Sequence, residues 1–159
     1  MSNFNSQKII APIMRFVNMK GIIALKDGML AILPLTVVGS LFLIIGQLPF
    51  EGLNQAIASV FGDTWTEPFM QVYSGTFAIM GLISCFSIGY SYAKNSGVEP
   101  LPAGVLSLSS FFILLKSSYV PAKGEPIGDA IAKVWFGGQG IIGAIIIGLV
   151  VGAIYTVFI

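Results

Sequence analysis

The fold is decided by residues 28–50, which read GMLAILPLTVVGSLFLIIGQLPF. This run contains no charged side chain, and a helix needs about 20 residues to cross the roughly 30 Å hydrocarbon layer of a membrane. It is too long, and begins too far from the N-terminus, to be a removable signal peptide. We therefore predict a permanent transmembrane helix over 28–50, kinked at Pro34, where the chain lacks an amide hydrogen.

Three more apolar runs follow along the chain. Residues 68–93 and 134–157 carry no charge and are each long enough to span a bilayer. Residues 100–119 are shorter in uncharged length and include Lys116, whose long side chain can reach the membrane surface. These runs predict an all-α polytopic membrane protein with about four transmembrane helices.

The composition supports this class and excludes several others. Hydrophobic residues make up 55% of the chain and charged residues 9%, against about 25% in a typical globular protein. The net charge of +1 gives no basic excess for nucleic acid. The chain has no histidine and one cysteine, Cys85, which falls inside an apolar run. We expect no catalytic residue, no metal site and no cofactor in this chain.

The segment before the first run, residues 1–27, is amphipathic. Lys8 and Arg15 are seven residues apart and share a helical face, whereas Ile9, Ile13 and Phe16 lie on the rest of the helix. Such a segment is typical of a helix that lies on the membrane surface. The alternative is a tail without helix, because Pro12 interrupts the pattern.

The charges also indicate an orientation. The basic residues before the first run, and the acidic loop at 51–67 that has no basic residue, predict a cytoplasmic N-terminus. If residues 100–119 cross, Lys116, Lys123 and Lys133 lie outside, against the same rule. A re-entrant segment at 100–119 would keep every basic residue in the cytoplasm, so charge alone leaves both arrangements open.

A stripe of small residues runs along one side of the last apolar run. Its members recur every four residues: Gly140, Ala144, Gly148, Gly152 and Thr156. Small residues at this spacing let a second helix approach closely, either in the same chain or across a dimer. The letters of 138–143 also fit G-x-G-x-x-G, but neither the preceding strand nor the later acidic residue of a dinucleotide site is present.

Polar residues inside the runs are few and uncharged. Ser84, Ser87 and Ser91 follow one another at helical spacing, which suits either a close helix contact or a polar path for a solute. No ionisable side chain lies deep in a run. This argues against the hypothesis that the chain is half of an ion-coupled carrier, since ion pathways usually need such groups.

Three ordered segments resemble one family. Residues 26–43, KDGMLAILPLTVVGSLFL, are similar to the opening of enzyme IIC, the membrane subunit of bacterial sugar phosphotransferase systems, in its lactose, cellobiose and diacetylchitobiose branch. Residues 89–104 and the Phe136-Gly137-Gly138-Gln139-Gly140 segment resemble the same branch. The family motif in the first run consists of Asp27, Gly28, Pro34, Thr36, Gly39 and Ser40.

The resemblance implies a bacterial cell-membrane permease that takes up a disaccharide and presents it to cytoplasmic IIB, which IIA serves. It divides the chain into a cytoplasmic amphipathic segment, 1–27, and an N-terminal transmembrane scaffold, 28–159. In the family, the sugar-binding histidine and glutamate lie in the second half of a longer chain, so the substrate site is expected beyond residue 159. The N-terminal half then supplies scaffold and a homodimer interface, and the chain is a cut or truncated piece. The alternative is a small autonomous oligomeric membrane protein with a regulatory or pore-forming role.

Overall fold

The computed structural model describes residues 18–115, 118–119, 127–128 and 131–159. Of the predicted amphipathic segment, 1–27, residues 1–17 lie outside the described residues. The elements in chain order are α2 (Lys20–Leu30), α3 (Leu33–Gly46), α4 (Glu51–Phe61), α5 (Glu67–Gly75), η1 (Phe77–Ile79), α6 (Met80–Ser96), α7 (Pro100–Leu114), β1 (Ser118–Tyr119), β2 (Ile127–Gly128), η2 (Lys133–Phe136), η3 (Gly138–Gly140) and α8 (Ile141–Phe158). The predicted all-α class is confirmed, and β1 and β2 form only a short antiparallel pair.

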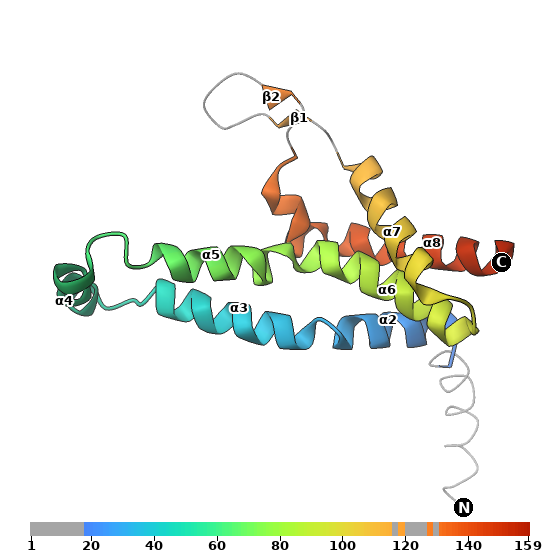
Figure 1. Cartoon of the computed structure of the whole chain (residues 1–159), viewed down its shortest axis with the longest axis horizontal. Coiled ribbons are helices and arrows are strands. Elements are labelled where there is room, and N and C mark those ends of the chain that lie inside the picture. Colours follow the sequence, from blue (N-terminus) through green and yellow to red (C-terminus); the bar gives the residue numbers. More distant parts are fainter. Residues whose placement is uncertain (1–17, 116–117, 120–126, 129–130) are drawn as a thin grey trace, which may run out of the picture.

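The first rod consists of α2 and α3, end to end (Figure 1). The helix is interrupted at Ala31 and Ile32, and Pro34 falls in the first turn of α3. An amide hydrogen in that turn has no intrahelical acceptor, so proline is tolerated there. The rod begins at Lys20, ahead of the predicted span, because a helix can continue through charged residues at a membrane boundary.

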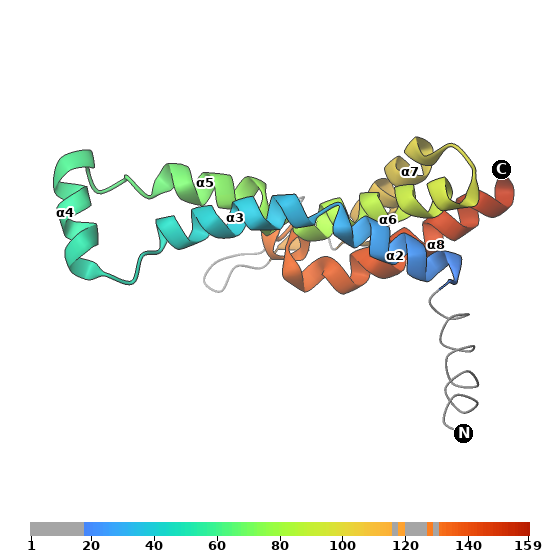
Figure 2. The same cartoon turned by 90° about the horizontal axis from the view of Figure 1, so that it is seen from below.

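The second rod consists of α5, η1 and α6, and runs antiparallel to the first (Figures 1 and 2). Its two α-helices are separated at Thr76, whose backbone leaves the helical region at φ −125° and ψ −86°. Helix α4 joins the two rods at the end farthest from the C-terminus and lies across it.

Helix α6 lies at the centre of the bundle, where it packs against α2, α7 and α8. It ends at Gly97, whose φ of +79° is left-handed and therefore favours glycine. The Val98 amide donates to the Ala93 carbonyl at 3.2 Å, which closes the helix end. Helix α7 then begins with Pro100 in its first turn and crosses α6 at a steep angle (Figure 1).

The interior of the bundle combines many small residues with a few large ones, Phe111 and Ile88 among them, whereas most of its exterior consists of large apolar side chains. Ala24, Ala93, Ala103 and Ala144 are each 0% exposed. Large apolar side chains on the outside of α3, α7 and α8 are by contrast about half exposed or more, among them Val37, Leu41, Ile44, Ile113, Ile142 and Val157. Close packing of small residues beneath a lipid-facing apolar surface is typical of membrane helices.

Three stretches of the described chain are long and apolar enough to cross a membrane: Lys20–Gly46, Glu67–Ser96 and Gly138–Phe158. They overlap the first, second and fourth predicted runs, 28–50, 68–93 and 134–157. Helix α7 has 15 residues and falls short of the usual length. A count of four crossings therefore stays a prediction.

Candidate functional site

The family motif of the first rod begins at the contact between α2 and α6. Gly28 is buried against Ile88, and a Cβ atom on Gly28 would lie 2.8 Å from the Ile88 Cα. The neighbouring Asp27 accepts a hydrogen bond at Oδ2 from the Asn95 side-chain amide, 3.0 Å away. Lys26 Nζ lies 3.4 Å from the other carboxylate oxygen of Asp27. The motif therefore joins α2 to α6 by a steric fit and a charge-assisted hydrogen bond.

The remaining motif residues lie along α3. The Thr36 hydroxyl donates to the Leu33 carbonyl at 2.8 Å, and the Ser40 hydroxyl to the Val37 carbonyl at 2.9 Å, so both bond within their own helix. Gly39 faces the break in the second rod, where a Cβ atom would lie 2.6 Å from the Thr76 hydroxyl oxygen. Pro34 and Gly39 thus lie at the two places where the rods are irregular.

The small-residue stripe of α8 packs against α6 of the same chain over most of its length. A Cβ atom on Gly148 would lie 2.9 Å from the Cys85 carbonyl oxygen, and one on Gly152 would lie 2.8 Å from the Tyr92 Cβ. Ala144 is 0% exposed. Gly140 abuts the Trp135 carbonyl, whereas Thr156 is half-buried and donates to the Ala153 carbonyl at 2.9 Å. Gly148 and Gly152 are therefore occupied within the chain.

On its other side, α6 meets α7 through a second close approach. Gly89 abuts the side chain of Ser107, so that no side chain would fit between the two helices there. The Cys85 thiol is buried and donates to the Ser107 carbonyl at 3.2 Å. Gly104 of α7 lies against the ring of Phe86. These contacts use Cys85 as a packing residue of the bundle.

A polar cavity of about 390 Å³ lies beside the α2–α6 contact. We call it the α2–α6 pocket, and it is lined by Asp27, Ala31, Phe86, Ser87, Tyr90, Ser91, Lys94 and Asn95. The rings of Phe86 and Tyr90 are stacked, with centroids 6.1 Å apart. The pocket thus combines a carboxylate, an ammonium group, an amide and three hydroxyls with an aromatic wall.

Two further hollows lie elsewhere on the described part of the chain. One, of about 500 Å³, is lined by Ile57, Phe61, Thr64, Trp65, Pro68 and Phe69 and is almost wholly apolar. The other, also about 500 Å³, lies where η1 meets η2 and includes Tyr73, Ser74, Lys133 and Gln139. In the described part of the chain, no three histidine, cysteine or carboxylate side chains come together as metal ligands.

Sequence reasoning singled out Asp27 and the serines but not the cluster that they form. Ser84 donates to the Met80 carbonyl at 2.6 Å and belongs to the packing of α6. Ser87 and Ser91 instead line the pocket together with Asn95, which comes next at the same four-residue spacing. That spacing places all three on one helix face. The pairing of Asn95 with Asp27 bridges 68 positions in the sequence and has no local signal.

The class defined by this fold is a polytopic membrane scaffold held by close helix contacts, with the α2–α6 pocket beside one of them near the end of α6. The family model for the phosphotransferase system, EIIC, matches residues 26–159. The chain belongs to this family, so the predicted resemblance is confirmed.

Individual relatives agree with this membership. The chain is 36% identical to the lichenan permease IIC component of Bacillus subtilis (strain 168), over 96% of this chain and 35% of that protein. It is also 36% identical to the cellobiose-specific EIIC component of Geobacillus stearothermophilus, over 83% of this chain and 30% of that protein.

A solved structure has the same fold. The crystal structure of the transporter ChbC, the IIC component of the N,N'-diacetylchitobiose-specific phosphotransferase system, superposes with a TM-score of 0.85 at 31% identity. The match covers 96% of this chain and 37% of ChbC. The chain therefore spans about a third of the length of the relatives that it matches.

Proposed function

We propose that this chain is the scaffold part of a disaccharide-type sugar permease, which works within a phosphoenolpyruvate-dependent phosphotransferase system. The observation that carries the proposal is the match of nearly the whole chain to the ChbC fold, with a TM-score of 0.85. The names of the relatives support a β-linked disaccharide such as cellobiose or diacetylchitobiose as the sugar of the complete permease.

The scaffold role follows from what the described helices do. Their closest contacts join helix to helix at Gly28, Gly89 and Gly148, and their large apolar side chains face outward. Sugar transfer to a phosphorylated cytoplasmic partner needs polar groups deep in the membrane, whereas the three apolar stretches have their charges near their ends. The sugar-contacting residues accordingly belong to the remainder of a full-length permease, and IIB and IIA serve that complete protein.

The orientation has the N-terminus in the cytoplasm of a bacterial cell. Lys20, Lys26 and Lys94 lie toward one end of the two rods, whereas Glu51, Asp63 and Glu67 lie around α4 at the other end. Basic residues are retained on the cytoplasmic side, so α4 lies outside. In this arrangement, α7 is the third of four crossings.

The complete permease is a homodimer in this proposal. Gly148 and Gly152 pack against α6 in the same chain, so these two glycines do not carry the dimer contact. The opposite side of α8 is largely uncovered by the described residues, since Ile142, Ile146 and Val150 are each more than half exposed. It offers a surface of the kind that a second membrane helix covers.

The proposal is tested with a full-length permease that contains this chain, expressed in a bacterium without other β-glucoside permeases. We expect labelled cellobiose or diacetylchitobiose to accumulate as the phosphate ester, and only when IIA and IIB are present. Uptake of free sugar without a phosphoryl donor would contradict the assignment. The isolated chain, purified in detergent, is expected to show no saturable binding of either sugar.

A further inference from the structure

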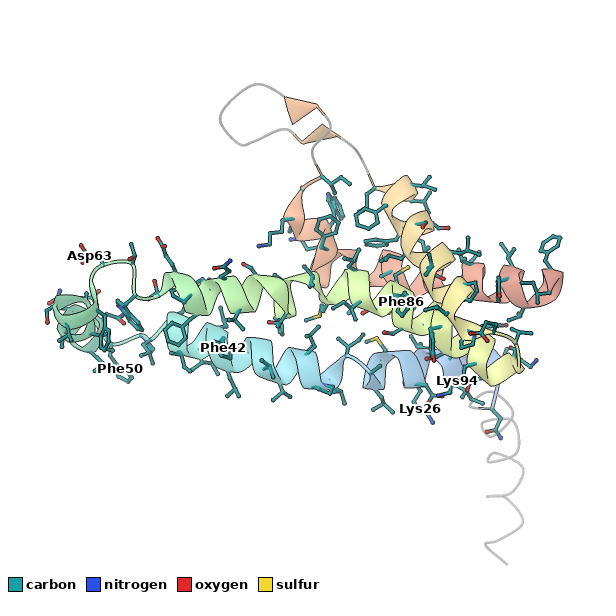
Figure 3. All side chains as sticks on the ribbon, in the orientation of Figure 1. Lys26, Phe42, Phe50, Asp63, Phe86 and Lys94 are labelled. Carbon is teal, nitrogen blue, oxygen red and sulfur yellow. The ribbon has the colours of Figure 1, made fainter. Side chains whose placement is uncertain are left out.

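The α2–α6 pocket lies at a boundary between charged and apolar surface. Lys26 and Lys94 lie near the end of the bundle where α2 begins, whereas Phe86 lies farther along α6 (Figure 3). Charged side chains are expensive in hydrocarbon, so Lys26, Asp27 and Lys94 mark the level at which the two rods enter the membrane. No charged residue follows Asp27 in α2 or α3. The pocket is therefore positioned at the level of lipid headgroups.

The pocket lining changes from charged to apolar with depth. Asp27, Lys94 and Asn95 lie at the outer end. Tyr90 and Ser91 come about one turn farther in, and Phe86 about two and a half turns, roughly 13 Å along the axis. The headgroup layer on each side of a bilayer is only about 5–8 Å deep. The pocket therefore extends through the headgroup layer to the start of the acyl chains.

The outer end holds charges of both signs. Asp27 supplies a carboxylate that is 37% exposed and fixed to Asn95 by a 3.0 Å hydrogen bond. Lys94 supplies an ammonium group from the neighbouring helix and also lines the pocket. Lys26 Nζ lies 3.4 Å from Asp27 Oδ1, on the side of the carboxylate away from Asn95. A zwitterion offers a second cation to this carboxylate and an anion to Lys94, whereas a purely anionic headgroup would face the Asp27 carboxylate.

Hydroxyl groups line the next level of the pocket. Ser91 is 8% exposed, and its hydroxyl takes part in none of the side-chain hydrogen bonds found among the described residues. Ser84, on the same helix, instead donates to its own backbone at 2.6 Å. A hydroxyl at this depth gains by donating to an acceptor, and the ester carbonyls of a phospholipid lie just below its phosphate.

The geometry points to a phospholipid site in which phosphatidylethanolamine occupies the α2–α6 pocket. Its ammonium group donates to Asp27, its phosphate accepts from Lys94, and its ester carbonyls accept from Ser91 and Tyr90. The acyl chains leave along Ala31 and Phe86 into the bilayer. Asp27 selects ethanolamine over choline, because a trimethylated nitrogen has no hydrogen to donate.

Native mass spectrometry tests this site directly. The delipidated chain in detergent is titrated with phosphatidylethanolamine, phosphatidylcholine and phosphatidylglycerol of identical acyl chains. We expect a one-to-one complex in which ethanolamine binds about tenfold more tightly than choline or glycerol, as one charge-assisted hydrogen bond allows. Equal affinities for the three lipids would overturn the proposal.

Variants separate the two ends of the headgroup. Asp27→Asn keeps the shape of the side chain and is expected to weaken ethanolamine binding about tenfold, with choline binding unchanged. Lys94→Gln should weaken the binding of phosphatidylethanolamine and of phosphatidylcholine equally, because both lipids carry the phosphate. The matched control is Asp63→Asn, since Asp63 follows α4 at the opposite end of the rods (Figure 3). An equal effect of the two aspartate variants would overturn the assignment of Asp27.

A second variant keeps the test decisive if Asp27→Asn disturbs the fold. Ser87→Leu fills the pocket at a half-buried position outside the Asp27–Asn95 contact. It should weaken the binding of all three lipids. Protection of the buried Cys85 thiol from a maleimide reports that each variant is folded. Displacement of the bound lipid by millimolar cellobiose or diacetylchitobiose would instead assign the pocket to a soluble sugar and overturn the lipid proposal.

Discussion

Gly28 of α2 lies against the backbone of Ile88 in α6, so closely that a Cβ atom on Gly28 would come within 2.8 Å of the Ile88 Cα and 2.9 Å of its amide nitrogen. Backbone atoms cannot move aside as a side chain can. We expect Gly28→Ala to separate α2 from α6 and to lower the free energy of unfolding by about 1–3 kcal/mol, the usual cost of overpacking. Thermal denaturation in detergent measures the loss.

The matched control for Gly28→Ala is Gly143→Ala in α8. Apart from its own helix backbone and its chain neighbours, no described atom lies within 4 Å of the Cβ position on Gly143, so the added methyl group has room. Alanine has a higher helix propensity than glycine, by about 1 kcal/mol in a helix interior. Gly143→Ala should therefore leave the midpoint of thermal denaturation unchanged or raise it. A loss equal to that of Gly28→Ala would contradict the steric explanation.

Gly148 makes the corresponding contact between α8 and α6. Gly148→Leu forces the two helices apart beside the Cys85 carbonyl, which lies 2.9 Å from the Cβ position. Cys85 is 0% exposed, so its thiol reports any opening of this contact. We expect its labelling rate by a maleimide to rise about tenfold or more, the change that about 1.4 kcal/mol in the opening equilibrium produces. Gly143→Leu is the control, and similar rates in the two variants would contradict the prediction.

The pattern of charged and apolar residues along the sequence predicted the helices well, but it predicted the contacts between them poorly. The uncharged runs predicted helices because hydropathy is a property of consecutive residues. The break at Thr76 carries no comparable signal. It lies where Gly39 meets Thr76 and Phe77 across the two rods, and such a contact depends on tertiary packing.

The polar pocket could be predicted only in part, for the same reason. The spacing of Ser87, Ser91 and Asn95 indicates one polar face of α6, but not the helix beside it. Asp27 was identified through its motif, while its hydrogen-bond partner lies 68 residues away in the sequence. The small-residue stripe on α8 could likewise be predicted only in part. Its pattern indicates a close helix contact, but not whether the second helix belongs to the same chain.

Exchanging the charge between Asp27 and Asn95 tests their hydrogen bond. Asn95→Asp places two carboxylates together and should lower the thermal midpoint by about 2 °C, because the pair is partly exposed and its contribution is small. The double variant Asp27→Asn with Asn95→Asp restores one carboxylate and one amide. It should recover most of the loss. A double variant less stable than Asn95→Asp alone would contradict the pairing.

Single-cysteine labelling in a Cys85→Ala background tests the orientation and the third crossing. Ser59→Cys is placed on an exposed position of α4, and we expect a membrane-impermeant maleimide to label it from outside the cell. Lys20→Cys, at the start of α2, should react only from the cytoplasmic side. The opposite pattern at these two positions would reverse the proposed orientation.

The third crossing depends on how a short helix reaches the far surface. The 15 residues of α7 are about 22 Å long, less than the roughly 30 Å hydrocarbon layer, and the steep angle between α7 and α6 shortens its reach along the rods further. The paired backbone of Ser118–Tyr119 and Ile127–Gly128 has open edges, which are unstable in contact with lipid. A crossing by α7 therefore requires the bilayer to be thinner beside it, so that this pair reaches the outer headgroups. We expect Lys123→Cys to be labelled from outside, whereas labelling from the cytoplasm alone would establish a re-entrant segment.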